Sequence, residues 1–279
     1  MSKSKPNPSD DRADDLSEDD QEGGEPILAF VLLEGESFPF ETFIDQLFET
    51  AMVDVWAEAF EGPDDGIFRF VLDDESVTVV LLPSQYPLDE LEGPMETSLL
   101  WPQDDPIERL RKHQTHLLIA VAGGEGAAIR RRMLLTAVTG LAAGQQGAMA
   151  VYWPEATHLV YPPLFAEMAA DIASSEAPPL WLWLDLRVFL NDDGTSGLFT
   201  TGMRPLGFME IEIPRIEMQP GELREWVLDI VSYLIENGPV LNDGDTIGAA
   251  EEQRILVRHR PSQFGHEGNV LCLLCDSGS

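Results

Sequence analysis

The residue types most capable of chemistry gather near the C-terminal end of the sequence. Asp243 and Asp245 follow Asn242 in a glycine-containing segment, and His259 and His266 come soon after them. Carboxylates and imidazoles bind divalent metals or act as general acids and bases. Glycines and small polar residues between them are typical of a loop that carries function. The candidate binding residues are Asp243, Asp245, Thr246, Arg258, His259, Arg260, Phe264, His266 and Glu267.

A metal site in this segment is one interpretation of these residues. Asn242, Asp243 and Asp245 resemble the opening of a calcium loop, where oxygen ligands recur at alternate positions. Such a loop closes with a glutamate at about the twelfth position, whereas Glu251 is the tenth residue counted from Asn242. We therefore predict no metal, no cofactor and no catalytic residue. A metal-dependent hydrolase centred on the two aspartates and two histidines is the alternative.

The residues around His259 suggest a structural arrangement. Arg258 and Arg260 flank it, so in a strand the two arginines would point to one face and the histidine to the other. In so acidic a chain we expect them to form internal ion pairs, for example with Glu251 or Asp245. Ser262 lacks the strand, turn and helix that surround a nucleophilic serine, so nucleophilic catalysis is not predicted.

The two cysteines, Cys272 and Cys275, have the spacing of a redox or zinc half-site. A redox pair opens a helix after a strand, but these residues interrupt an apolar run. A structural zinc would need two further ligands, and the chain has no second cysteine pair. A structural role is therefore favoured.

The acidic charge is the strongest global property of the sequence. Fifty acidic and 17 basic residues give a net charge of −33. Residues 1–25 hold nine acids and three bases, so most of the excess lies in the remainder. Such a charge repels nucleic acids and anionic membranes and attracts basic proteins. We expect a basic protein partner, no nucleic acid and no membrane.

The length and composition are those of an ordinary globular protein. The 279 residues are 44% hydrophobic and 24% charged, which permits one or two domains. No apolar run approaches the roughly 18 residues of a membrane span, and no secretory signal is recognisable, so the expected compartment is the cytoplasm. Residues 1–25 have almost no apolar side chains and are predicted to be a disordered acidic tail.

Apolar spacing predicts the elements of the first half. A continuous apolar run follows Pro26, helical spacing follows Phe40, and β-branched residues on either side of Asp73 indicate a hairpin. A proline-rich connection then leads to further helices and strands. The predicted strands are 27–33, 66–71, 76–82, 116–122 and 148–153, and the predicted helices are 40–60, 106–113, 127–144 and 161–172.

Strands dominate the second half. Strands are predicted over 181–190, 198–201 and 208–213, with a tight turn between the first two, and a helix over 220–238. Glu210 and Glu212 alternate with apolar residues, which predicts a half-buried strand with a polar face. The pattern indicates an α+β fold with mixed or antiparallel sheets and packed helices. We divide it into two subdomains, residues 26–176 and 177–276.

Several motifs together resemble one bacterial family, known as domain of unknown function 4261. The resemblance extends over residues 27–274, and the family's name implies no biochemical activity. The motifs are Glu92-Gly93-Pro94, Thr97-Ser98, Trp101-Pro102, Val151-Tyr152-Trp153, Thr200-Thr201-Gly202-Met203, residues 207–212, residues 238–248 and residues 261–268.

A second resemblance suggests a function. Gly207, Phe208 and Glu210, then Trp226, then the segment 244–247 follow the order of a motif in Suppressor-of-fused-like domains. Bacterial members of that group look like immunity proteins that neutralise toxins. The resemblance and the charge together imply a non-catalytic cytoplasmic binding protein, and the function we expect is that of an immunity protein for a basic toxin or secreted effector. An accessory protein of a secretion system is a further alternative.

Overall fold

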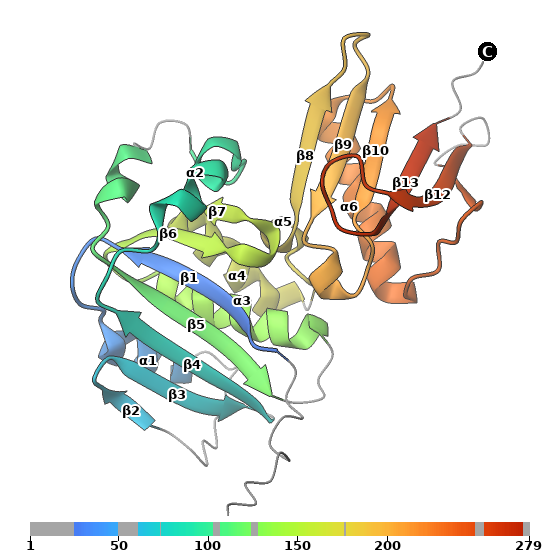
Figure 1. The fold of residues 1–279 in the computed structure, drawn as a ribbon. Coiled ribbons are helices and arrows are strands. Elements are labelled where there is room, and N and C mark those ends of the chain that lie inside the picture. Colours follow the sequence, from blue (N-terminus) through green and yellow to red (C-terminus); the bar gives the residue numbers. More distant parts are fainter. Residues whose placement is uncertain are drawn as a thin grey trace, which may run out of the picture.

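The computed structural model describes residues 25–49, 61–72, 74–102, 107–123, 128–175, 177–248 and 254–275. These residues form an α+β fold of two sheets with packed helices (Figure 1). The predicted acidic tail before residue 25 and the second half of the predicted 40–60 helix lie outside the described residues. Within those ranges, none of the helices has the length and apolar character that crossing a membrane requires.

The first sheet is antiparallel and has seven strands in the order β2-β3-β4-β5-β1-β6-β7. β1 lies near its centre, and Val31 and Leu32, which point to opposite faces, are both fully buried. This explains why β1 is a continuous apolar run rather than an alternating one. The strands are β1 (Ile27–Leu33), β2 (Glu61–Asp64), β3 (Ile67–Leu72), β4 (Glu75–Leu82), β5 (Thr115–Gly123), β6 (Ala148–Trp153) and β7 (His158–Val160).

Helices cover both faces of this sheet. On one face lie α1 (Phe40–Glu49), α3 (Ala128–Ala143) and α4 (Pro162–Ser175). Gly140 of α3 lets α4 approach closely, because a Cβ at Gly140 would lie 2.4 Å from the Ala169 Cβ. On the other face, α2 (Leu88–Thr97) and the 3-10 helix η1 (Ile107–Lys112) cover one end and bury a second cluster that includes Phe30 and Leu32.

The second sheet has six strands in the order β11-β12-β13-β10-β9-β8. It is mixed, since β10 pairs with β13 in parallel and its other pairs are antiparallel. One face packs against α6 (Pro220–Asn237), which buries Val227, Val231 and Leu234. The strands are β8 (Asp185–Leu190), β9 (Ser196–Thr201), β10 (Ile211–Ile216), β11 (Thr246–Ile247), β12 (Ile255–Pro261) and β13 (Asn269–Cys275).

A short helix, α5 (Leu180–Trp183), joins the two sheets where a strand was predicted from residue 181. The first residues of the predicted 181–190 strand are therefore helical. The Leu182 N–H donates to the Pro179 carbonyl at 2.8 Å and closes a helical turn. The turn buries Trp183, whose indole N–H donates to the Thr136 hydroxyl of α3 at 2.8 Å. The chain becomes extended only at β8.

The sequence also failed to predict α2, whose Gly93 and Pro94 suggested an irregular connection. Leu91 and Met95 lie four residues apart on one side of this helix, and both are buried against the sheet. The burial of that apolar side outweighs the poor helix propensity of Gly93 and Pro94. The predicted helix at 106–113 is the shorter η1.

Candidate functional site

One row of residues crosses the second sheet on the face opposite α6. In the strand register, Arg258 of β12 pairs with Cys272 of β13, Cys272 with Glu212 of β10, Glu212 with Phe199 of β9, and Phe199 with Arg187 of β8. Side chains of directly paired residues point to the same face of a sheet. We call the face that carries these five residues the outer face.

Glu212 occupies the middle of the outer face and is fully buried. The Ser262 hydroxyl donates to its Oε1 at 2.5 Å, and the Gln263 backbone N–H donates to its Oε2 at 3.1 Å. The prediction of a half-buried strand was therefore wrong, because the face that carries Glu212 is buried as well. The loop of residues 262–268, hereafter the 262–268 loop, crosses the outer face and supplies donors that replace water (Figure 1).

Glu210 precedes β10 and is also buried, with 2% of its surface exposed. Its Oε1 accepts the backbone N–H groups of Gly202, Met203 and Arg204 at 3.1, 3.0 and 3.2 Å. Its Oε2 accepts the Thr200 hydroxyl at 2.6 Å. Successive N–H groups of this kind form a concave anion site, here filled by the protein's own carboxylate.

The 262–268 loop is organised around the Ser262 hydroxyl. While it donates to Glu212, the hydroxyl oxygen accepts the N–H groups of Phe264 and His266, both at 3.0 Å. The Phe264 ring stacks on Phe199 with centroids 4.8 Å apart and planes inclined by 15°. The loop is therefore fixed to the outer face by both hydrogen bonds and an aromatic pair.

Arg204 holds the far end of the same loop. Its guanidinium donates to the carbonyl oxygens of Glu267 and Asn269, the latter at 3.3 Å. Its backbone N–H is one of the donors to Glu210. Arg204 thus links the Glu210 turn to the 262–268 loop, and Glu267 takes part through its backbone while its residue surface is exposed.

Asp243 and Asp245, which were predicted as binding residues, lie in a separate turn beside β12. Asp243 accepts the His259 backbone N–H at 2.9 Å and lies 3.4 Å from the Arg258 guanidinium. The Asp245 carboxylate accepts the Asn242 N–H at 2.7 Å, which closes the turn. Arg258 forms an ion pair with an acid of this turn, but with Asp243 and not Asp245, and Glu251, the other expected partner, lies outside the described residues.

The two predicted histidines lie on opposite faces of the sheet. The His259 Nε2 lies 2.9 Å from the Leu241 carbonyl on the α6 side, and Arg258 faces the other way, as the alternation predicted. The centroid of the His266 ring lies 6.0 Å from that of the Phe199 ring on the outer face.

No group of three or more His, Cys, Asp or Glu side chains placed to hold a metal occurs in the part of the chain that the structure describes.

The remaining predicted residues are Arg260 and Thr246, and Arg260 lies near Cys272, one of the two cysteines for which a structural role was favoured. Burial raises the pKa of the Cys272 thiol, an effect that nearby Arg260 opposes and Glu212 reinforces. Burial likewise raises the pKa of Cys275. Both thiols are held in the neutral form, which suits strand residues of a core better than nucleophiles or thiolate ligands. Thr246 is exposed in β11 and pairs with Leu256.

The predicted residues therefore separate into two groups. Asp243 and Asp245 form the turn beside β12, Thr246 follows it in β11, and His259 contacts it from β12. Arg260, Phe264, His266 and Glu267 belong to the outer face and its loop. Arg258 lies on the outer face and reaches the turn through its ion pair with Asp243. The sequence missed the residues that organise the outer face. Thr200, Glu210, Glu212 and Ser262 lie in motifs that it displays, and Phe199 and Arg204 flank the Thr200–Met203 motif.

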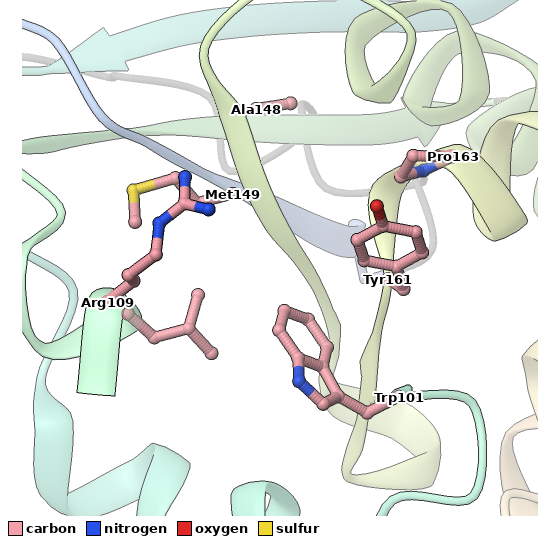
Figure 2. Close-up of a pocket in the computed structure, with 7 residues that line it drawn as sticks. Trp101, Arg109, Ala148, Met149, Tyr161 and Pro163 are labelled. Carbon is pink, nitrogen blue, oxygen red and sulfur yellow. The ribbon is translucent and has the colours of Figure 1, made fainter. Parts of the chain in front are cut away.

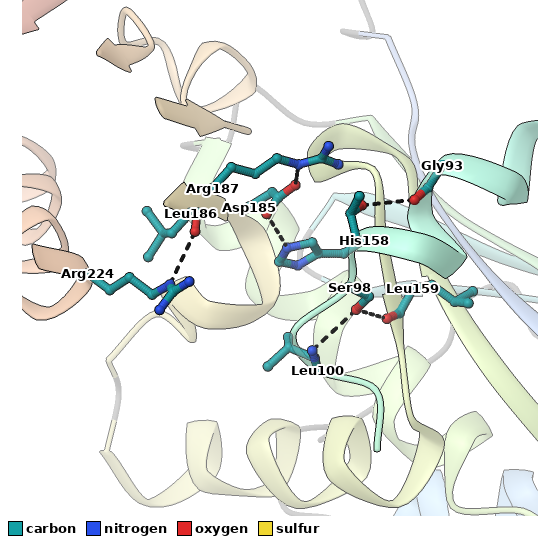
Figure 3. A network of polar contacts seen from close by, with 10 residues as sticks. Gly93, Ser98, Leu100, His158, Leu159, Asp185, Leu186, Arg187 and Arg224 are labelled. Carbon is teal, nitrogen blue, oxygen red and sulfur yellow. Dashed lines mark hydrogen bonds and ion pairs between the residues drawn. The ribbon is translucent and has the colours of Figure 1, made fainter. Parts of the chain in front are cut away.

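A second polar centre joins the two sheets (Figure 3). The His158 ring of β7 lies 3.5 Å from Asp185 of β8, and the Arg187 Nε donates to the same carboxylate at 2.5 Å. Burial alone would raise the pKa of Asp185, but His158 and Arg187 outweigh it and hold the pKa below its ordinary value. Arg224 of α6 donates to the adjacent Leu186 carbonyl at 3.3 Å. The centre fixes the first strand of the second sheet against the edge of the first.

Residues 199–273 are a domain of the family described as Domain of unknown function (DUF4261). The matched segment begins within β9 and ends within β13, and it contains Glu210, Glu212 and the whole 262–268 loop. The resemblance is confirmed over this segment, and the motifs before residue 199 lie outside it. Comparison with curated proteins and with solved structures gave no match.

Proposed function

We propose that the protein is a non-catalytic cytoplasmic binding protein, an immunity protein that captures a basic toxin or effector on its acidic surface. The net charge of −33 is the observation that carries this proposal. A basic partner approaching such a field gains association rate, and like-charged competitors are repelled.

The solvent side of α6 is the described surface that best fits such a partner. Glu222, Glu225, Asp229 and Glu236 are exposed along it, and Tyr233 is 50% exposed among them. The one basic residue of α6, Arg224, donates to the Leu186 carbonyl. An exposed aromatic ring surrounded by carboxylates suits a lysine-rich or arginine-rich surface.

The roles of the C-terminal polar residues also support binding rather than catalysis. Ser262, Asp243 and Asp245 each form hydrogen bonds that hold a turn or loop on the sheet. Side chains engaged in this way stabilise the fold. They would have to break these contacts before they could act on a substrate.

Binding to a basic protein encoded beside this gene tests the proposal. We expect a complex whose affinity falls at least tenfold when salt rises from about 50 to about 200 mM, because exposed charge pairs are screened. Glu225→Lys with Asp229→Lys should weaken the complex further. Glu34→Lys with Glu36→Lys makes the same charge change on the first half and serves as the control.

Two results would reject the proposal. One is that no neighbouring basic protein binds and that co-expression protects cells from none of them. The other is a complex whose affinity is unaffected by salt, which would show that the acidic surface does not select the partner.

A further inference from the structure

Four strands form the edges of the two sheets, β2 and β7 in the first and β8 and β11 in the second. An edge strand presents backbone N–H and C=O groups to solvent, and natural proteins close most such edges. β2 has only four residues, one of which is Pro63 and has no N–H. β11 has only two residues. Neither of these edges offers a long row of free backbone groups.

The chain itself closes the edge of β7. The Tyr161 N–H, directly after this strand, donates to the Leu100 carbonyl at 3.0 Å. The Ser98 hydroxyl donates to the Leu159 carbonyl within the strand. Figure 2 shows the Trp101 ring beside that of Tyr161, and the two meet edge to face with centroids 5.8 Å apart. Residues 98–101 therefore lie along β7 where another strand would bind.

The strand register shows which backbone groups of β8 point away from the sheet. In an antiparallel ladder, pairs that bond to each other alternate with pairs that direct their N–H and C=O groups outward. The Asn191 N–H donates to the Thr195 carbonyl at 2.8 Å and closes the β8–β9 hairpin. Counting back from this bonded pair, the outward groups belong to Leu190, Val188 and Leu186.

Part of this outward edge is open. Arg224 of α6 covers one end, because its guanidinium donates to the Leu186 carbonyl at 3.3 Å. No hydrogen bond from another described residue reaches the outward N–H and C=O groups of Val188 and Leu190. The Leu190 side chain is 70% exposed, and β8 has no proline or lysine that would discourage pairing. This end of β8 is therefore free to pair with an added strand.

An open cleft of about 410 Å³ lies beside Leu190, between the β8–β9 turn and the start of α6. The carboxylates of Asp193, Glu217 and Glu222 line it. Asp193 forms an ion pair with Arg215 at 3.1 Å. Glu217 and Glu222 are exposed, and neither forms an ion pair with another described residue. The cleft therefore has a negative charge that favours a lysine or arginine side chain.

The alternation of side chains connects the edge with the cleft. Val188 and Leu190 lie on the α6 face of the sheet, opposite to the face of Arg187. Directly paired residues share a face, so a residue added opposite either of the first two would point toward α6 and the cleft. The residues between would lie beside Arg187, whose charge repels a second cation. A fitting segment therefore alternates basic with apolar residues.

We propose that the open edge of β8 binds an extended segment of a basic partner protein as a seventh, antiparallel strand. Its basic residues lie opposite Val188 and Leu190 and reach the cleft, while its backbone pairs with the outward groups of these residues. A second copy of this chain is disfavoured, because it would bring its own charge of −33 to the edge. Glu222 also belongs to the acidic side of α6, so the inference deepens the proposed function and rests on it for the charge of the partner.

An acetylated and amidated Lys-Val-Lys-Val-Lys peptide is the probe, and the backbone amide signals of ¹⁵N-labelled protein are the readout. We expect saturable shifts at Val188 and Leu190, with a Kd below about 1 mM. N-methylation of the central lysine, whose N–H faces β8 in the proposed pairing, should weaken binding at least about tenfold. N-methylation of a valine, whose N–H faces away, should weaken it less than about twofold.

Variants of the protein provide a second test. Val188→Pro removes one outward N–H and should weaken peptide binding at least about tenfold, whereas Val188→Thr keeps that N–H and should weaken it less than about twofold. Glu217→Gln with Glu222→Gln should weaken it at least about threefold. Glu225→Gln with Asp229→Asn, which removes the same charge from α6 outside the cleft, should weaken it less than about twofold.

The proposal is overturned by the absence of a saturable shift, by equal effects of the two N-methylations, by equal effects of the two charge-removing pairs, or by a dimer of the free protein that Val188→Pro dissociates. The N-methylated peptides decide the matter if Val188→Pro does not fold. Each of these results rejects the edge site alone, because the complex with a neighbouring basic protein is measured separately and can still form through the acidic side of α6.

Discussion

At the scale of single residues, several buried polar groups in this protein are matched by donors or acceptors supplied at short range or across a loop. Glu210 receives four hydrogen bonds from residues 200–204, and Glu212 receives two from residues 262 and 263. His113 is matched in the same way. Its Nδ1 lies 2.6 Å from the Leu110 carbonyl, and its Nε2 accepts the Tyr86 N–H at 2.7 Å. This arrangement requires a neutral ring.

His113 should make stability depend on pH. Burial lowers the pKa of His113 from its ordinary 6.5, partly offset by the bond to Leu110 and reinforced by His116. As pH falls below 6.5, the unfolded chain binds a proton that the folded chain does not, so stability is lost until the folded pKa is reached. Above pH 6.5 His113 is neutral in both the folded and the unfolded state, so it no longer makes the free energy of unfolding depend on pH.

Urea unfolding between pH 5 and 8 measures this effect. His113→Gln should be less stable than wild type by about 1–3 kcal/mol at pH 7.5, because buried hydrogen bonds are lost. Since glutamine does not titrate, the difference should shrink toward pH 5, by up to about 1.4 kcal/mol per pH unit. A difference that stays constant across the range would contradict the assignment.

At the scale of elements, the 262–268 loop decides the character of the outer face. Without it, Phe199 and Cys272 would meet solvent, and Glu212 would lie on the exposed polar face that the alternation predicted. The Ser262 hydroxyl makes three hydrogen bonds at the centre of the loop, one as donor and two as acceptor. Its order therefore depends on a single side chain.

Ser262→Ala should release the loop. It leaves one Glu212 oxygen and the N–H groups of Phe264 and His266 without partners, so we expect a loss of about 2 kcal/mol in the free energy of unfolding. Amide exchange at Phe264 and His266 should become faster. Gln263→Ala is the matched control, because it keeps the backbone N–H that donates to Glu212. Equal effects of the two variants would argue against the central role of the hydroxyl.

The sequence predicted most elements and few of the site's contacts. The spacing of apolar residues and the β-branched residues located five strands of the first sheet, β1, β3, β4, β5 and β6, to within a few residues. They also located the turn after Leu190. Those signals are local. The burial of Glu212 depends on Ser262, fifty residues further along the chain, so local alternation indicated solvent instead. The division at residues 176 and 177 stays a prediction.

At the scale of the whole molecule, the two sheets share one hydrophobic core. The cluster that fills the space between the first sheet and its helices continues through Trp153 and Trp183 to Leu198 and Val231 of the second half. Gly202 reinforces the junction, since a Cβ there would lie 2.3 Å from the Trp183 carbonyl oxygen. We therefore expect the halves to unfold together.

Trp183→Ala tests this coupling. Loss of a fully enclosed tryptophan should lower the free energy of unfolding by about 3–5 kcal/mol. Because the core is shared, amide exchange should accelerate in β1 and in β10 alike. Leu190→Ala is the control, since that side chain is 70% exposed and its loss should cost under about 0.5 kcal/mol. Acceleration confined to one sheet would mean that the halves are energetically separate.

The position of β13 has a consequence for protein synthesis. This strand lies between β12 and β10, and its pairing with β10 is parallel and joins residues some sixty positions apart. During translation, β8, β9 and β10 therefore leave the ribosome before β13. Until β13 arrives, the edge of β10 that it will cover has no partner strand. That edge stays open until residue 275 has been translated and has left the exit tunnel. During that interval the nascent chain is most exposed to aggregation and to chaperones.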